Sequence, residues 1–257
     1  MAKEYLRYFL ERTDHHSIQS PFASSVYQEL KAYTRQYRKG NPALETLRKT
    51  LAQDNSILDI KDEGAGSKFA VGSKRSIASI CKNACSSLSH NLLYQFLVTK
   101  TPASTVLELG TSLGINTGYL AAVTSGVVYT FEADCSLLKV AKNNLNIFPN
   151  VKFVRGNIRD TLPEFLTEQS RIDFIQVDAH HTYEATLEYC RLFWPYLHEH
   201  SVVVIGDIHW SAEMKKAWLE IKMFRGVSST MDFFECGVLF FRKEIQPDHH
   251  ILYYPAF

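Results

Sequence analysis

The stretch TVLELGTSLGINTGYLAA, residues 105–122, decides the fold of this chain. Apolar residues surround Glu108, after which Gly110, Gly114 and Gly118 recur at four-residue intervals and an apolar run follows. This order predicts a buried strand, a tight glycine turn and a helix that begins almost at once. Glycine lets the backbone approach a ligand closely, and the start of a helix presents unpaired N–H groups. The stretch therefore predicts a pocket of nucleotide size.

From this stretch onward, strand-like and helix-like patterns alternate. Strands are expected at residues 105–109, 127–132, 151–155, 172–177 and 201–206, with a final pair near 227–233 and 236–241. Helical patterns separate the first five runs, which predicts an α/β fold with a doubly wound, mostly parallel sheet of seven strands. The last two runs lack an intervening helix and contain Gly237. We therefore expect them to form an antiparallel hairpin at one edge of the sheet.

The first hundred residues have a different character, with helix-period patterns bounded by breakers. Helices are expected at residues 3–12, 22–38, 42–53, 74–87 and 89–99. We interpret residues 1–100 as a helical N-terminal extension and 101–257 as the α/β domain. A second glycine loop, Gly64 to Ser67, follows a strand-like run, but the residues after it are too polar for a buried helix. We expect that loop to lie near the site rather than to be the main cofactor loop.

Composition bounds the class of protein. The 257 residues are 46% hydrophobic and 21% charged, with a formal net charge of +1, as in ordinary globular proteins. Such a charge gives no general attraction to nucleic acid or to an anionic membrane. The start of the chain lacks a signal-peptide pattern, and no run reaches the roughly 18 apolar residues of a membrane span. We expect a cytoplasmic protein whose five scattered cysteines are reduced packing thiols.

Ligands of doubly wound sheets bind beyond the carboxyl ends of the strands. Polar residues or glycines follow each of the first five predicted strands, at 108–114, 132–134, 156–158, 178–181 and 206–209. Glu132, at the end of the second strand, is placed to accept hydrogen bonds from two ribose hydroxyls. The G-x-x-x-G spacing argues against a dinucleotide, and Glu108 suits a cationic amine better than a pyrophosphate. The ligand predicted here is a cationic ribonucleoside.

The motifs ELGTSLG and FEAD resemble those of class I S-adenosylmethionine-dependent methyltransferases. More narrowly, IDFIQVDAHHTYE and VVVIGDIHWS resemble the bacterial O-methyltransferase-like group related to catechol O-methyltransferases; the likeness covers about residues 100–242. It implies a Rossmann-like methyltransferase fold and in-line methyl transfer from S-adenosylmethionine to an oxygen of a small molecule. The cofactor-binding residues that it implies are Glu108, Gly110, Thr111, Ser112, Gly114, Asn116, Glu132, Ala133, Asn157, Ile158 and Asp178. Among them, Glu108, Gly110 and Asn116 would face the methionine end.

The same resemblance bears on the acceptor side, where the candidate catalytic residues are Asp178, His181, Asp207 and His209. In metal-dependent relatives three oxygen ligands hold magnesium; Asp178 and Asp207 match two of them, but Ile208 stands in the third place. Gly206 also replaces an expected aspartate. We therefore assign no metal ligands, although magnesium can be held by two carboxylates. His181 is the hypothetical base, preferred to the neighbouring His180 because it matches the motif.

Two alternatives stay open at this point. One is a non-catalytic or regulatory protein that keeps the cofactor pocket, which Gly206 and Ile208 make plausible. The other is an NAD-dependent oxidoreductase on a similar fold, disfavoured by the glycine spacing. The tail RKEIQPDHHILYYPAF is interpreted as a docked segment or a subunit contact, so a homodimer is possible.

Overall fold

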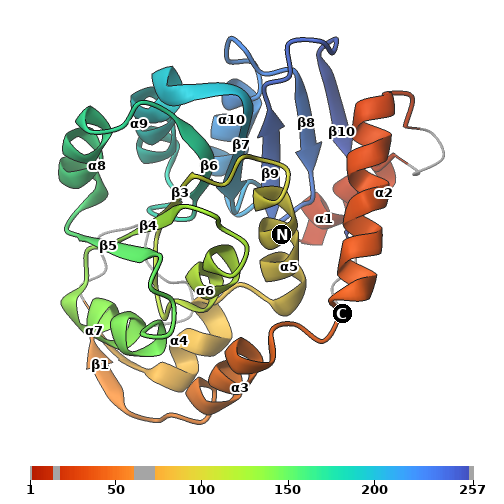
Figure 1. Ribbon diagram of the computed structural model, residues 1–257. Helices are drawn as coiled ribbons and strands as arrows, with labels where there is room; N and C mark the ends of the chain where they lie inside the picture. The colour runs from red at the N-terminus through yellow and green to blue at the C-terminus, as the bar shows by residue number, and fades with distance from the viewer. Residues whose placement is uncertain (1, 14–17, 61–72, 255–257) are drawn as a thin grey trace.

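The computed structural model describes residues 2–13, 18–60 and 73–254, and a central sheet of eight strands dominates it (Figure 1). In the sheet the strand order is β10-β8-β9-β7-β6-β3-β4-β5. The strands are β3 (Thr105–Leu109), β4 (Val127–Glu132), β5 (Val151–Arg155), β6 (Ile172–Val177), β7 (Leu197–Gly206), β8 (Ser229–Asp232), β9 (Cys236–Phe240) and β10 (Asp248–Ile251). Five strands, β3 to β7, run parallel, and β9 runs antiparallel to both of its neighbours. The predicted doubly wound α/β fold is confirmed.

Two predictions about the sheet were wrong. The expected seven strands are eight, because β10 adds to β8 in parallel and occupies the outermost place. The β8–β9 hairpin is antiparallel as expected but lies inside the sheet, not at its edge. The C-terminal tail is thus a strand of the main sheet. Leu252, just beyond it, is completely buried, and its N–H donates to Asp232 O.

Helices cover both faces of the sheet because its central strands are apolar on both sides. They are α1 (Ala2–Glu11), α2 (Pro21–Gln36), α3 (Pro42–Leu51), α4 (Ile77–Ala84), α5 (Leu88–Val98), α6 (Ile115–Ala121), α7 (Cys135–Asn144), α8 (Ile158–Thr167), α9 (Tyr183–Phe193) and α10 (Ala212–Ile221), with a 3-10 turn η1 (Trp194–Tyr196). One apolar core joins α2, α5 and α6 to one face, and a second joins α8, α9 and α10 to the other. A third lies among α3, α4 and α6.

The expected helix 74–87 begins later than predicted. Lys74–Ser76 is a strand, β2, which pairs antiparallel with β1 (Ile57–Asp59) to form a separate two-stranded sheet. Helix α4 starts only after Ser76, whose extended backbone and side-chain oxygen, accepting from Ser79 N, form the N-cap. The second glycine loop, Gly64 to Ser67, lies outside the described residues.

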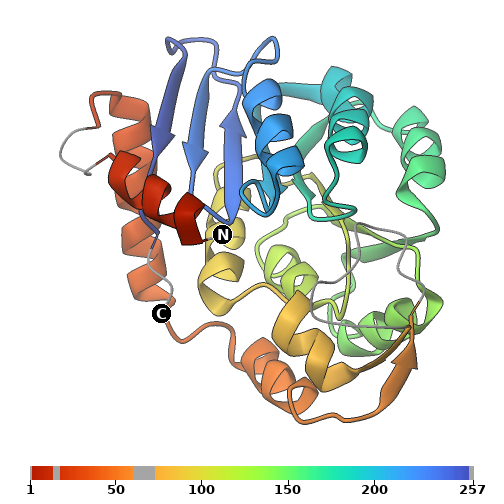
Figure 2. The same cartoon turned by 180° about the vertical axis from the view of Figure 1, so that it is seen from behind.

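The N-terminal helices share their core with the C-terminal strands. Tyr8 donates to Leu252 O at 2.5 Å, Tyr27 donates to Tyr253 O at 2.6 Å, and Tyr254 donates to Ser89 O at 2.7 Å. Figure 2 shows α1 lying across the ends of β8, β9 and β10. The N-terminal segment therefore covers the end of the sheet beside which the predicted site lies.

Two further expectations concern cysteines and membranes. All five cysteines are free, and Cys81, Cys190 and Cys236 are buried, as packing thiols should be. Among the described residues, no helix combines the length and the apolar character that crossing a membrane requires.

Candidate functional site

The loop between β3 and α6 has a backbone that only glycine fits at two places. Gly110 has φ +110°, and a Cβ there would lie 2.4 Å from the carbonyl oxygen of Asp178. Gly114, the N-cap of α6, has φ +83°, and its Cβ would lie 2.7 Å from Leu145. Strand β6 and helix α7 thus approach the loop so closely that any side chain would clash. The tight glycine turn between strand and helix that the sequence predicted is confirmed.

Glu108 lies beneath this loop and is 1% exposed. Its carboxylate accepts hydrogen bonds from Asn116 Nδ2 at 2.7 Å, Thr117 Oγ1 at 2.5 Å and Thr130 Oγ1 at 2.6 Å. Burial raises the pKa of Glu108 to about 7, and the three hydrogen bonds oppose that shift. The acid is therefore a fixed, buried group at the floor of the loop.

Glu132 closes the other side of the loop. Its Oε2 accepts from Ser112 N at 2.9 Å and its Oε1 accepts from Asp134 N at 3.0 Å. Burial raises the pKa of this carboxyl, and the backbone hydrogen bonds of Asp134 and Ser112 counter it. Thr111, the other polar residue of the loop, is buried and contacts Thr130 Oγ1 at 2.6 Å. Glu132 thereby links the loop to the end of β4.

Two of the predicted cofactor-binding residues, Asn157 and Ile158, lie at the start of α8. Asn157 caps that helix, its Oδ1 accepting from Arg159 N at 2.9 Å. Ile158 is 4% exposed and belongs to the core of that face of the sheet. Ala133 is half-buried beside Glu132.

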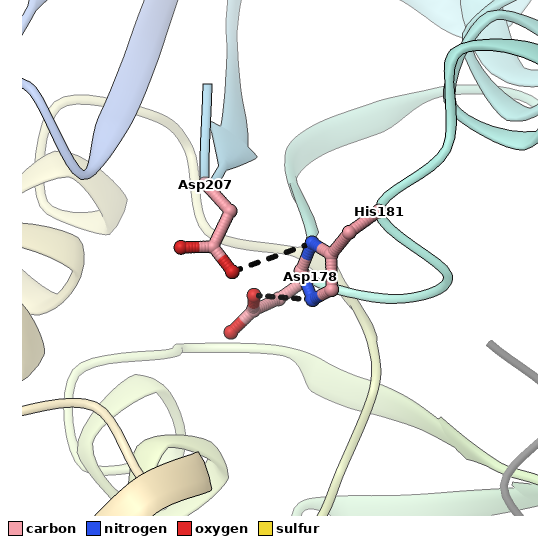
Figure 3. Close-up of side chains that lie close together, drawn as sticks. All are labelled: Asp178, His181 and Asp207. Carbon is pink, nitrogen blue, oxygen red and sulfur yellow. Dashed lines mark ion pairs between the residues drawn. The ribbon is translucent and has the colours of Figure 1, made fainter. Parts of the chain in front are cut away.

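Asp178, His181 and Asp207 come together from the ends of β6 and β7 (Figure 3). His181 Nε2 lies 3.8 Å from Asp178 Oδ1, and His181 Nδ1 lies 3.5 Å from Asp207 Oδ2. One ligand atom from each residue can be chosen so that all lie within 4.8 Å of one another. His181 and Asp207 both have positive φ, +43° and +56°, a strain that is common at functional sites. This donor set is able to hold a divalent cation.

Neighbouring residues explain two departures from the expected motif. A Cβ on Gly206 would lie 2.7 Å from Asp178 Oδ1, so the missing side chain leaves room for that carboxylate. Ile208 is completely buried and packs in the core instead of facing Asp207. His180 contacts Tyr189 OH through Nδ1 at 2.8 Å.

His209 forms a second arrangement, held by the turn between β8 and β9. Its Nε2 lies 2.8 Å from Asp232 Oδ2, and its ring stacks on Phe234 at 5.2 Å between centroids. A carboxylate can only accept, so Nε2 carries a proton and donates it to Asp232, and the other ring nitrogen is Nδ1. That Nδ1 is buried and has no hydrogen-bond partner. Asp232 was not predicted from the sequence.

His90, on α5, is a further buried imidazole that the sequence did not indicate. Its Nδ1 lies 3.2 Å from Glu235 Oε2 and 3.0 Å from Ser87 Oγ, while its Nε2 is buried without a partner. Burial lowers the pKa of His90, while the charges of Glu235 and Asp178 act in the opposite direction. A helix-period pattern places this residue on a helix but carries no signal of its proximity to the site.

Residues 107–208 match the family model described as "Methyltransferase domain". These residues are therefore similar to a methyltransferase domain. The matched segment runs from β3 through β7 and contains Glu108, Glu132 and the cluster of Asp178, His181 and Asp207. The resemblance seen in the sequence is confirmed for this domain, and the match gives the oxidoreductase alternative no support.

Solved structures share the fold of residues 107–208 and of much of the rest of the chain. An SAH-bound methyltransferase from Podospora anserina has a TM-score of 0.59 at 13% identity, over 87% of this chain and 98% of that one. An O-methyltransferase from Bacillus cereus in complex with SAH has a TM-score of 0.55 at 16% identity, covering 82% and 99%. The O-methyltransferase TomG from Streptomyces achromogenes, in complex with SAM, has a TM-score of 0.51 at 18% identity, covering 62% and 82%. No curated protein sequence matches the chain.

Proposed function

We propose that this protein transfers a methyl group from S-adenosylmethionine to an oxygen atom of a small molecule. The observation that carries the proposal is the loop between β3 and α6, with buried Glu108 below it and Glu132 beside it, inside a methyltransferase domain. Structures with the same fold have been crystallised with SAM or SAH. The oxygen acceptor rests on the O-methyltransferases among them.

The residues around the loop fit the methyl donor. S-adenosylmethionine supplies a methyl group on a positively charged sulfonium. Glu108 and Asp178 provide negative charge towards its ammonium and sulfonium, and Glu132 provides carboxylate oxygens for the ribose. Two buried polar atoms, Ser112 Oγ and Gln176 Nε2, have no partner among the residues that the structure describes and are suited to a polar ligand.

On the acceptor side, His181 between Asp178 and Asp207 is the proposed base. Transfer in line needs the acceptor oxygen aligned with the sulfonium and its proton removed. An imidazole is suited to take that proton, and the two carboxylates stabilise the cationic ring that results. If His181→Ala retained wild-type kcat/KM on an acceptor, this role would be excluded.

A divalent cation at the same cluster is the second candidate role for these three residues. Two carboxylates and an imidazole suit manganese, iron or zinc better than magnesium, which prefers oxygen ligands. In that role His181 would be a ligand, and its removal would lower metal affinity. Turnover after treatment with EDTA distinguishes the two roles, because only the metal role predicts its loss.

The proposed function is tested first by calorimetry. We expect S-adenosylhomocysteine to bind and NAD not to bind; the reverse result would overturn the proposal. A screen of catechols and phenols, with and without added metal, then tests turnover. Cofactor binding without turnover on any acceptor would support the non-catalytic alternative.

A further inference from the structure

A chain of hydrogen-bonded side chains, buried or half-buried, runs from α3 to the floor of the glycine loop. Arg48 Nη2 donates to Asn91 Oδ1 at 2.5 Å, and Asn91 Nδ2 donates to Asn116 Oδ1 at 2.8 Å. Asn116 Nδ2 then donates to Glu108 Oε1 at 2.7 Å and to Gln176 Oε1 at 2.8 Å. Asn91 and Gln176 are completely buried, while Arg48 and Asn116 are half-buried, so water has little access to these hydrogen bonds.

The chain has one direction, and Arg48 sets it. A guanidinium can only donate, so Asn91 must turn its oxygen to Arg48 and its amide nitrogen to Asn116. Asn116 must then turn its nitrogen towards Glu108 and Gln176. Without Arg48, the Asn91 amide could rotate by a half-turn, and its oxygen would then face the Asn116 oxygen, which is repulsive.

Arg48 is itself held in place. Its Nη1 donates to Ser86 O at 2.8 Å, and its Nε lies 3.1 Å from Glu45 Oε2. Glu45 also accepts from Tyr119 OH at 2.8 Å, which ties α3 to α6. Each of the three guanidinium nitrogens therefore has an acceptor, and the group is held in one orientation.

One donor at the far end of the chain is free. Gln176 uses its oxygen to accept from Asn116, while its Nε2 is buried without a partner. A buried N–H that bonds to nothing is costly, and a carboxylate oxygen of a ligand would satisfy it. Together with the Glu108 carboxylate, the floor of the loop offers an acceptor for an ammonium and a donor for a carboxylate. Those are the two groups of an α-amino acid.

We infer that Arg48 and Asn91, both in the N-terminal segment, are positioning residues that orient Asn116, Gln176 and Glu108 to bind the α-amino-acid end of the methyl donor. The inference rests on the proposed function. It assigns part of the donor site to helices α3 and α5, outside the segment that matches the methyltransferase family.

The test compares two ligands that differ only at that end. S-adenosylhomocysteine carries the amino acid, whereas 5′-methylthioadenosine lacks it. For Asn91→Ala and Asn91→Asp we expect affinity for S-adenosylhomocysteine to fall about tenfold or more by calorimetry, the effect of one lost buried hydrogen bond. Affinity for methylthioadenosine should stay within about twofold, since no interaction with its ribose or adenine changes.

Two controls separate positioning from stability. Asn91→Asp keeps the acceptor for Arg48 but cannot donate to Asn116, so it should fold normally even if Asn91→Ala does not. Gln95→Leu removes another buried polar side chain one helical turn later, which donates to Tyr119 O at 3.0 Å and is not part of the chain. It should lower Tm and leave affinity for S-adenosylhomocysteine unchanged.

The outcomes are distinct. Equal losses for both ligands, or no loss for either, in the Asn91 variants would overturn the inference while the proposed function stands. If the wild-type protein bound neither ligand, the proposed function would fail and the inference with it.

Discussion

Glu108 is an acid in a place where ionisation is costly. Burial raises its pKa from 4.5 to about 7, so between these pH values the folded protein binds more protons than the unfolded chain. Stability then falls as pH rises through that window, by up to about 3 kcal/mol from the pKa difference. We expect Glu108→Gln, which stays neutral, to lose this part of the pH dependence.

Urea unfolding at pH 5 and pH 8 measures the effect. The free energy of unfolding of the variant, relative to wild type, should be higher at pH 8 than at pH 5. If the two proteins changed in parallel between these pH values, the interpretation of Glu108 would be wrong.

Gly206 is small because Asp178 occupies the space beside it. Gly206→Ala would place a Cβ 2.7 Å from Asp178 Oδ1 and turn that carboxylate away. Only S-adenosylmethionine carries a sulfonium charge, so its affinity should fall about threefold to tenfold more than that of S-adenosylhomocysteine. Calorimetry with both ligands measures this ratio.

Gly226→Ala is the matched control for that substitution. Gly226 has φ +96°, and its Cβ would meet only Phe241, at 3.9 Å. It should lower Tm through backbone strain and leave the affinity ratio unchanged. An unchanged ratio in Gly206→Ala as well would contradict the account of Gly206.

Among single site residues, the sequence predicted those that follow strands. It missed those that reach the site from helices or hairpins. Asp178, His181 and Asp207 could be grouped because the carboxyl ends of parallel strands meet at one edge. Asn91 and His90 lie on a helix that is buried almost all round. Such a helix has no polar face, so nothing in its periodicity distinguishes a side chain at the site from one in the core.

Among the strands of the main sheet, β10 is the one that sequence patterns failed to predict. The residues from Asp248 to His250 are polar, so this strand lacks the apolar alternation that identified β3 to β7. Its pairing depends on β8 and on Leu252 and Tyr254 just beyond it, which fill the core shared with α2 and α5. The five parallel strands were predicted closely because burial on both faces makes each a continuous apolar run.

The docking of this tail predicts a large effect at one residue and a small one at its neighbour. Leu252 is completely buried, so Leu252→Ala should cost about 2–5 kcal/mol. The Tyr253 ring is 41% exposed, so Tyr253→Ala should cost roughly 1 kcal/mol or less. Unfolding in urea compares them; if Leu252→Ala cost as little as Tyr253→Ala, the tail would not stabilise the fold.

For the molecule as a whole, the open question about the cluster of Asp178, His181 and Asp207 is whether it binds a metal ion that takes part in methyl transfer. If it is a metal site, the protein should bind one manganese ion, detectable by electron paramagnetic resonance. Asp207→Asn and His181→Ala should each weaken that binding at least about tenfold. Asp160→Asn, which alters the first turn of α8, is a control that should leave manganese binding unchanged.

No manganese binding by the wild-type protein would exclude the metal role and leave His181 as the proposed base.

The division of the chain at residue 100 and a homodimer also stay predictions. Leu6 and Leu10 of α1 are 59% and 75% exposed, and light scattering in solution would show whether a second copy is present.

The contacts between the two ends of the chain also govern when the protein can fold. Tyr8 bonds to Leu252, 244 residues later, and α2 and α5 bury their apolar faces against β9 and the residues beyond β10. During synthesis at about 5–20 residues per second, the finished N-terminal helices wait on the order of ten seconds or more for those partners. Through that interval they expose apolar surface on the ribosome. Native packing of the N-terminal helices therefore follows the synthesis of the last residues of the sheet.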